Sequence, residues 1–329
     1  MKCSDINIRD PFIVCKDGIY YMYGTRAANF GNRTGGFDVY TSADLETWSD
    51  PIPCFDSEKY GMNRAVNWAP EVHEYRGSYY MFATFTQESG LKGTCVLKSD
   101  SLTGPFVPHG DVLLTPKEWE SLDGTLYVSP KGVPYLVFCH EHMQIIDGTV
   151  VYVQLSDDLT HTVGEMTVLF KASETGCCDP YPMNDGNHYV TDGPYMYRSA
   201  GDELFMIWSS FIKGAYVELA VKFTNGDLST DFVHMPPLYT KDGGHGMLFR
   251  TTDGRLFFTF HSPNASGHEH PCFLEIEDRA TDSKQNNRKS TAPLYLCDMA
   301  EISFAQTSDF GVFYAIFTHE FTENTCNCI

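Results

Sequence analysis

The sequence predicts an all-β fold, a five-bladed β-propeller with four-stranded antiparallel blades. Two observations favour this fold. A unit made of a small or acidic opening, an apolar stretch, a turn and an aromatic-rich strand occurs five times, with copies roughly 50 to 70 residues apart. No long helical periodicity interrupts the copies, which disfavours a parallel sheet covered by helices.

The copies span residues 10–23, 70–85, 123–138, 192–208 and 244–260. Four of them open on a carboxylate and the fifth has a histidine at the matching place, so the five openings are Asp10, Glu71, Asp123, Asp192 and His245. Equivalent positions of radially arranged units converge on the axis, so we expect these side chains to surround one central cavity. Carboxylates gathered in one cavity suggest acid/base chemistry.

Each copy contains a predicted β-hairpin. In the first copy the apolar residues 12–15 lead into Lys16-Asp17-Gly18, a turn signal, and then into 19–23. The corresponding turns are predicted at 75–77, 130–132, 199–202 and 252–254. Further strands are expected at 37–42, 94–99, 150–154 and 216–220, and short outer segments at 44–48 and 101–106. Each unit thus supplies about four strands, the content of one blade.

Two regions are distinguished along the chain. Residues 1–278 are predicted to form the propeller, and residues 279–329 form a tail that carries no sixth copy. The tail begins with a polar run at 281–289 that is typical of a linker.

Composition excludes several classes of function. The net charge of −20 disfavours nucleic acid as a partner, because a phosphate backbone attracts basic surfaces. No apolar run approaches the ~20 residues that cross a bilayer, and the first residues lack an apolar signal core, so a cytoplasmic protein is expected. The eleven cysteines are irregularly spaced, as expected for small buried hydrophobic residues. Nothing in the sequence indicates the oligomeric state.

Four motifs together resemble glycoside hydrolase family 43. They are Arg9-Asp10-Pro11-Phe12, Trp68-Ala69-Pro70-Glu71-Val72, Asp123-Gly124 and Asp192-Gly193-Pro194-Tyr195, in that order. Each motif is weak alone, but their order and their phase within the repeats make the combination fairly specific. The resemblance covers roughly residues 5 to 278. It implies a five-bladed propeller that acts on arabinose- or xylose-containing glycans such as arabinan and xylan.

The resemblance also implies three catalytic roles for an inverting hydrolase. Asp10 would be the general base that activates water, Asp123 the carboxylate that tunes the proton donor, and Asp192 the donor. The working pair must lie about 6.5 to 9.5 Å apart to leave room for water, and a neighbouring acid raises the donor's pKa.

The sequence departs from the family at the donor, where Asp192 stands in place of the usual Glu before Gly-Pro. Aspartate is one methylene shorter, and a misplacement of about 1 Å can cost ~100-fold in rate. Three alternatives remain open. The backbone is advanced so that Asp192 still serves, Glu71 reaches in as the donor, or activity is weak or lost.

Several residues are candidates for binding. By resemblance, His245 would face the axis and ligate a structural calcium or sodium, although the chemistry requires no cofactor. Trp68 would present its ring at the cavity rim, where it can stack on a pentose. Glu71, Arg9, Phe30 and Arg250 are further candidates for substrate contact.

We therefore predict an inverting glycosidase that releases L-arabinose or D-xylose from plant-type oligosaccharides in carbohydrate metabolism. Exo action is slightly favoured, because a cytoplasmic enzyme meets imported oligomers, although an arabinan endo-hydrolase would share these motifs. One alternative is a non-catalytic sugar-binding propeller. Another is a glycoside phosphorylase on a similar scaffold, which would need a cluster of basic residues that the sequence does not obviously contain.

Overall fold

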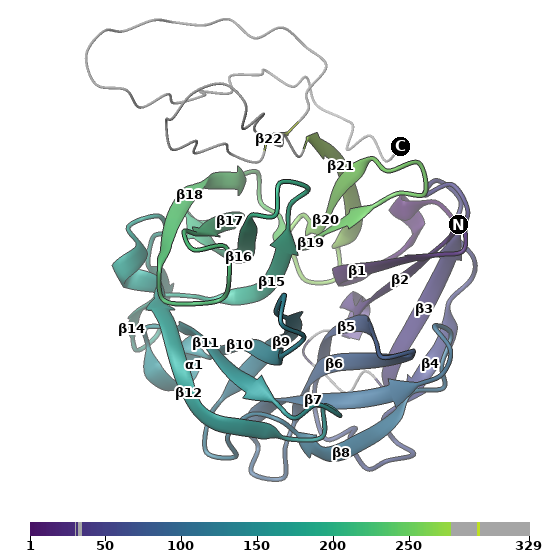
Figure 1. The fold of residues 1–329 in the computed structure, drawn as a ribbon, viewed down its shortest axis with the longest axis horizontal. Coiled ribbons are helices and arrows are strands. Elements are labelled where there is room, and N and C mark those ends of the chain that lie inside the picture. The colour runs from purple at the N-terminus through teal and green to yellow at the C-terminus, as the bar shows by residue number, and fades with distance from the viewer. Residues whose placement is uncertain (30, 32–34, 278–294, 297–329) are drawn as a thin grey trace, which may run out of the picture.

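The computed structural model is a ring of five four-stranded antiparallel sheets, as predicted. It describes residues 1–29, 31, 35–277 and 295–296. In each sheet the strands follow one another in sequence order, and β1, β5, β9, β15 and β19 lie nearest the centre of the ring (Figure 1). The expected tail lies almost wholly outside the described residues.

Blade 1 consists of β1 (Ile8–Lys16), β2 (Ile19–Arg26), β3 (Gly36–Ser42) and β4 (Ile52–Asp56). Blade 2 consists of β5 (Asn67–Tyr75), β6 (Ser78–Thr86), β7 (Lys92–Ser99) and β8 (Val107–Leu113). Blade 3 consists of β9 (Ser121–Val128), β10 (Pro134–His140), β11 (Thr149–Leu155) and β12 (Thr162–Lys171). Blade 4 consists of β15 (Asp192–Arg198), β16 (Leu204–Ile212), β17 (Ala215–Phe223) and β18 (Phe232–Tyr239). Blade 5 consists of β19 (Gly244–Arg250), β20 (Leu256–Ser262), β21 (His270–Glu277) and β22 (Tyr295–Leu296).

Short elements lie between the strands. The helix α1 (His142–Ile145) connects β10 to β11, and a small hairpin of β13 (Tyr181–Met183) and β14 (Gly186–His188) precedes blade 4. Single 3₁₀ turns lie at Cys3–Asp5, Ala27–Asn29 and Ala172–Thr175. No helix in the described ranges is long and apolar enough to cross a membrane.

The turns between the first and second strands of the blades match the prediction. Asp17 and Gly18 both have positive φ (51° and 81°), as do Arg76 and Gly77 (47° and 82°). This is the conformation of the tight hairpin turn that Asp-Gly sequences favour. The predicted outer segments at 44–48 and 101–106 are not themselves strands. Residues 44–47 and 101–103 form bends and turns, and the fourth strands β4 and β8 begin only at Ile52 and Val107.

The hydrophobic core is divided into five clusters, one between each pair of neighbouring blades. Strand β16 shows how the sequence produces this arrangement, because successive side chains of a strand point to opposite faces. Met206 and Trp208 pack toward blade 3, whereas Phe205 and Ile207 pack toward blade 5. Each blade is therefore apolar on both faces, and the ring is held together by side-chain packing around its whole circumference.

Candidate active site

Every blade has one residue in the left-handed conformation near the start of its innermost strand. These residues are Asp10 (φ 54°), Ala69 (47°), Asp123 (57°), Gly193 (51°) and His245 (50°). Each is followed by a shift in the pairing register with the second strand. The shared distortion is a β-bulge, and it brings the side chains of Asp10, Asp123 and His245 together.

This shared position corrects the phase of two predicted openings. Asp192 precedes the equivalent residue Gly193 by one position, and Glu71 follows the equivalent residue Ala69 by two. The sequence pattern missed this offset because the bulge adds an unpaired residue that leaves no mark in apolar periodicity. Trp68 and Asp192 therefore occupy the same position in different blades.

Hydrogen bonds link this position in four of the five blades to the second strand of the blade before it. The backbone N–H groups of Ala69, Asp123 and His245 donate to the hydroxyl oxygens of Thr25 (2.7 Å), Thr84 (2.9 Å) and Ser209 (2.7 Å). The N–H of Asp10 donates to Nδ1 of His261 (3.2 Å), which joins the last blade to the first. At the fifth junction Cys139 stands at the acceptor position, and the N–H of Gly193 donates to Asp123 Oδ2 instead (3.1 Å). The backbone that carries the carboxylates is thus fixed around the ring.

Asp10 is 6% exposed and is surrounded by groups that favour its ionised form. Burial acts to raise its pKa, but the charges of His245 and Arg9 outweigh burial and lower it. Nδ1 of His245 lies 3.2 Å from Asp10 Oδ1, and the hydroxyl of Thr25 donates to Oδ2 (2.7 Å). Asp10 is therefore a carboxylate over the physiological range, as a general base must be.

Asp123 and Asp192 have the opposite electrostatics. Burial and then the charge of Asp10 raise the pKa of Asp123 well above its ordinary value. Burial, followed by repulsion from Asp123 and Glu141, raises the pKa of Asp192 to about 7. The pair retains a proton close to neutral pH, which is the state that an acid catalyst requires.

Tyr216 fixes the orientation of the Asp192 carboxyl group. Its hydroxyl donates to Asp192 Oδ2 at 3.0 Å, and burial raises the pKa of Tyr216 well above its ordinary value, so the hydroxyl keeps its proton. Because Oδ2 accepts this hydrogen bond, the proton of a neutral Asp192 lies on Oδ1. Oδ1 is therefore the oxygen that can donate to a substrate.

Arg9 lies directly beside the base. Its Nη1 donates to Oε1 of the fully buried Glu269 (2.9 Å), and its Nε lies 3.9 Å from Asp10 Oδ1. Arg9, which the sequence predicts to contact the substrate, thus also forms an ion pair that links blade 1 to the loop before β21. Burial acts to lower the pKa of Arg9, but the charge of Asp10 and other neighbours raise it.

Glu71 lies one layer further along the axis and pairs with His73, whose Nε2 is 3.0 Å from Glu71 Oε2. A cavity of about 10 Å³, the size of one water molecule, is lined by Asp10, Phe12 and Glu71 among others. The paired position of Glu71 favours Asp192 over Glu71 as the proton donor.

Two polar residues that were not among the predicted site residues, Glu141 and His142, lie beside the carboxylates. Glu141 is 5% exposed, and its Oε1 lies 3.0 Å from Nε2 of His142. Burial acts to lower the pKa of His142, but Glu141 raises it through a hydrogen bond and its charge. Both residues come from the connection between β10 and β11, outside the repeated unit, so only the polar run His140-Glu141-His142 signalled them.

The remaining predicted contacts have different outcomes. Trp68 is half-buried at the start of β5, with Lys92 Nζ 5.4 Å from its ring centroid. Arg250 lies at the opposite end of β19 from His245, where it donates to Gly254 O and to the Tyr197 hydroxyl. The structure therefore does not bring Arg250 to the carboxylates. Phe30 lies outside the described residues.

The calcium or sodium ion expected near His245, which the resemblance implies is usually held through water, stays a prediction. Nδ1 of His245 faces Asp10 and also lies 3.8 Å from Asp123 Oδ2. A Cβ on Gly193 would lie 2.6 to 3.0 Å from Cδ2, Cγ and Nε2 of His245, so the imidazole ring packs closely against that glycine. No group of three His, Cys, Asp or Glu side chains in the described part of the chain is placed to hold a metal. His245 instead lies between two carboxyl groups, with Nδ1 facing both of them.

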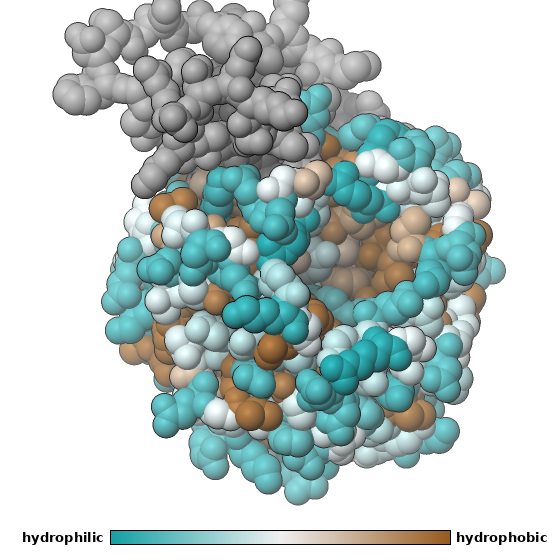
Figure 2. All heavy atoms as spheres, viewed as in Figure 1, coloured by the Kyte–Doolittle hydropathy of each residue, from teal (hydrophilic) through white to brown (hydrophobic). Residues whose placement is uncertain are grey.

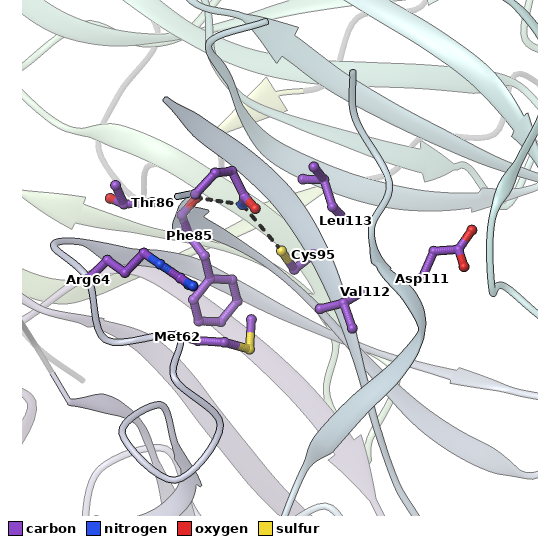
Figure 3. Close-up of a pocket in the computed structure, with 9 residues that line it drawn as sticks. Met62, Arg64, Phe85, Thr86, Cys95, Asp111, Val112 and Leu113 are labelled. Carbon is purple, nitrogen blue, oxygen red and sulfur yellow. Dashed lines mark hydrogen bonds between the residues drawn. The ribbon is translucent and has the colours of Figure 1, made fainter. Parts of the chain in front are cut away.

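A second cavity, of about 160 Å³, lies in blade 2 between β6, β7 and β8 (Figure 3). The Gln87 side chain donates to the Phe85 carbonyl oxygen (3.0 Å) and to Cys95 Sγ (3.7 Å). Of the charged residues that line it, Arg64 pairs with Glu88 and Asp111 is exposed. This cavity does not share a lining residue with the axial site. The face drawn in Figure 2 is hollowed near the place that Figure 1 gives to β1, β19 and β20.

Comparison with known proteins finds a family model and solved structures that this chain resembles. The family model described as glycosyl hydrolases family 43 matches residues 5–280. The crystal structure of an endo-arabinase from Bacteroides thetaiotaomicron is 36% identical, with a TM-score of 0.78, over 85% of this chain and 97% of that one. An endo-1,4-beta-xylanase structure from the same organism is 22% identical, with a TM-score of 0.66, over 83% of this chain and 91% of that one, and supports the fold alone.

One curated relative bears on location. It is an extracellular endo-alpha-(1->5)-L-arabinanase of Thermotoga petrophila, 26% identical over 62% of this chain. The match covers 45% of that protein, so this chain spans about half the length of its curated relative. The extracellular relative contradicts the cytoplasmic location expected from the sequence. That expectation depended on the lack of an apolar segment near residue 1, which does not determine where a protein acts.

Proposed function

Because this chain belongs to glycosyl hydrolases family 43, we propose that it is an inverting hydrolase of L-arabinofuranosyl or D-xylosyl linkages in plant-type oligosaccharides. One observation carries the proposal. Three carboxyl groups, the buried Asp10 and Asp123 and the half-buried Asp192, converge at one end of the axis with pKa values shifted in opposite directions. Inversion needs this division, because one group must accept a proton while another releases one.

Asp10 is the base in the proposed reaction. Its ionised carboxylate takes a proton from water, and the water oxygen forms a bond to the anomeric carbon. Thr25 and His245 hold the carboxylate in place through the contacts to Oδ2 and Oδ1. The positive charge of Arg9, 3.9 Å from Oδ1, keeps the base ionised.

Asp192 is the acid. The bond between the anomeric carbon and the leaving oxygen breaks as Oδ1 of Asp192 delivers its proton to that oxygen. The pKa of about 7 keeps a large fraction of Asp192 protonated near neutrality. Asp123 maintains this pKa of Asp192 by repulsion. Its Oδ2 also accepts a hydrogen bond from the backbone N–H of Gly193, the residue that follows the acid in sequence. After product release, the base loses its proton and the acid regains one.

Arabinan is the first substrate to test. The relative with 36% identity is described as an endo-arabinase, and the curated relative as an endo-arabinanase. The slight preference for exo action depended on the cytoplasmic location and loses its support with it. Endo cleavage of a linear arabinan is therefore the mode that we propose, with xylan as the second candidate.

The two alternatives have weaker support. A phosphorylase needs cations available to an anion, but Arg9 is paired with Glu269 and Lys92 with Glu120. A non-catalytic sugar-binding propeller would not need opposed pKa values in its carboxyl groups.

The decisive experiment measures hydrolysis of linear arabinan, xylan and nitrophenyl pentosides by the wild type, Asp10→Ala and Asp192→Glu. We expect turnover by the wild type, its loss in Asp10→Ala, and retained or increased turnover in Asp192→Glu. Asp111→Asn, an exposed acid in the blade 2 cavity, is the matched control and should behave as the wild type. Sugar binding without turnover in every variant would establish the binding protein, and sugar 1-phosphate formed in phosphate buffer would establish the phosphorylase.

A further inference from the structure

A small hairpin stands between blades 3 and 4 immediately before the strand that carries Asp192. It consists of β13 and β14, with Tyr181 directly opposite His188 in the pairing. Side chains that are directly opposite lie on the same face of a hairpin, so Tyr181 and His188 share one face. An isolated two-stranded hairpin is marginally stable, so this one must be supported by its neighbours.

Both neighbouring blades support the hairpin. On the side of blade 3, the ring of His188 lies 5.2 Å from that of His142, with their Nδ1 atoms 3.0 Å apart. On the side of blade 4, the N–H of Asp179 donates to Phe211 O (2.7 Å), and Asp179 Oδ2 accepts from the N–H of Lys213 (2.7 Å). The position of Tyr181 is thus fixed relative to the catalytic end of blade 4.

Three aromatic rings form a continuous row from the hairpin to the acid. The ring of Tyr181 lies 4.4 Å from that of Phe211, and Phe211 lies 5.2 Å from Tyr216. Tyr216 is 1% exposed and donates to Asp192, whereas Phe211 and Tyr181 are half-buried. The row therefore begins in the core at the acid and ends in contact with solvent.

The direction of this row has a chemical meaning. An acid catalyst must face the oxygen of the leaving group, and the next sugar of the substrate is bonded to that oxygen. The row starts beside the acid, at the hydroxyl that binds Asp192 Oδ2, and leads outward to Tyr181, so its solvent-facing end is a surface on which a sugar bonded to the leaving oxygen can rest. Aromatic faces bind the apolar faces of sugar rings, while Tyr181 also offers a hydroxyl to sugar hydroxyl groups.

We propose that Tyr181 and Phe211 form a binding subsite for a pentose ring on the leaving-group side of the cleaved bond. The inference rests on the proposed function, and it adds that the enzyme prefers substrates with at least one sugar beyond that bond. Such a preference distinguishes an enzyme acting within a chain from one that removes a residue from a small aglycone.

The test compares substrates that have or lack the leaving-group sugars. We would measure kcat/KM on arabinotetraose and on an arabinosyl fluoride, whose leaving group is a single atom, for the wild type, Tyr181→Ala, Tyr181→Leu and Tyr181→Phe. We expect Tyr181→Ala and Tyr181→Leu to lower kcat/KM for the tetrasaccharide about 3- to 10-fold, mainly through KM, and to leave the fluoride unchanged. Tyr181→Phe should retain most activity on the tetrasaccharide because it keeps the ring.

Tyr135→Ala is the matched control. Tyr135 is also half-buried between two tyrosine rings, at 6.4 and 6.1 Å, but it lies at the opposite end of blade 3. Equal losses on both substrates in Tyr181→Ala, or no loss on either, would overturn the subsite. If the wild type hydrolyses no pentosaccharide, the proposed function fails, and calorimetric titration with arabinotetraose and xylotetraose still tests the subsite. Equal affinities of the wild type and Tyr181→Ala in that titration would refute it.

Discussion

The hydrogen bond from Tyr216 to Asp192 controls the pH at which the acid loses its proton. Tyr216→Phe removes a donor 3.0 Å from Oδ2 in a position that is 1% exposed. A hydrogen bond to a charged group contributes about 1.5 to 3 kcal/mol, and one pKa unit corresponds to about 1.4 kcal/mol. Since the bond favours the ionised form, its loss should raise the pKa of Asp192 from about 7 by roughly 1 to 2 units.

The assay is the pH dependence of kcat/KM on arabinan oligosaccharides. Activity falls as pH rises through the pKa of the acid, so the alkaline limb near pH 7 in the wild type should move to about pH 8 to 9 in Tyr216→Phe. Tyr195→Phe removes a hydroxyl that donates to Leu248 O (3.1 Å) and should leave the limb in place. A limb that stays near pH 7 in Tyr216→Phe, or moves to lower pH, would refute the assignment of Asp192 as the acid held by Tyr216.

Three further predictions follow from the ring of contacts around the site. Thr25→Val removes one hydrogen bond to the base Asp10 and one to the backbone of blade 2. It should move the acidic limb of the kcat/KM profile about 1 pH unit higher and lower the free energy of unfolding in urea by about 2 kcal/mol. Thr25→Ser keeps the hydroxyl and should restore both quantities. Glu218 is buried and has a pKa of about 8 against an ordinary 4.5, so the folded state binds the extra proton and stability falls as pH rises between these values. Glu218→Gln should remove that fall, so the free energy of unfolding of the variant relative to the wild type should be up to about 4 kcal/mol higher at pH 8.5 than at pH 4. Equal urea midpoints of variant and wild type at both pH values would contradict this expectation. Gly193→Ala should lower kcat more than 10-fold, because its Cβ would lie 2.6 Å from the His245 ring, whereas Gly18→Ala, which has a positive φ but open space, should keep kcat unchanged.

The repeat and its turns were readable in the sequence because they depend on local chemistry. Pairs such as Asp17-Gly18 favour one turn geometry, and aromatic strands alternate between two buried faces. The convergence of Asp10, Asp123 and His245 followed from the repeat once its units were placed around an axis. All three share the left-handed position in their blades.

The rest of the site depends on features that the pattern does not encode. The bulge hid the true equivalents of Asp10 in blades 2 and 4, so Glu71 was placed one layer too near the base. Tyr216 lies on a third strand, and nothing separates it in sequence from the other eighteen tyrosines. Its role arises only from the distance to Asp192, which tertiary packing sets.

The bond between His261 and the backbone of Asp10 has a consequence for the integrity of the whole ring. Each blade is built from consecutive strands, so among the described residues no strand is shared across the seam where the last blade meets the first. Side chains close that seam instead, and the catalytic base is one of the residues that they hold. Opening of this seam would therefore also displace the catalytic base. A molecule in which blades 1 and 5 have separated would lose activity even while its other blades are still folded.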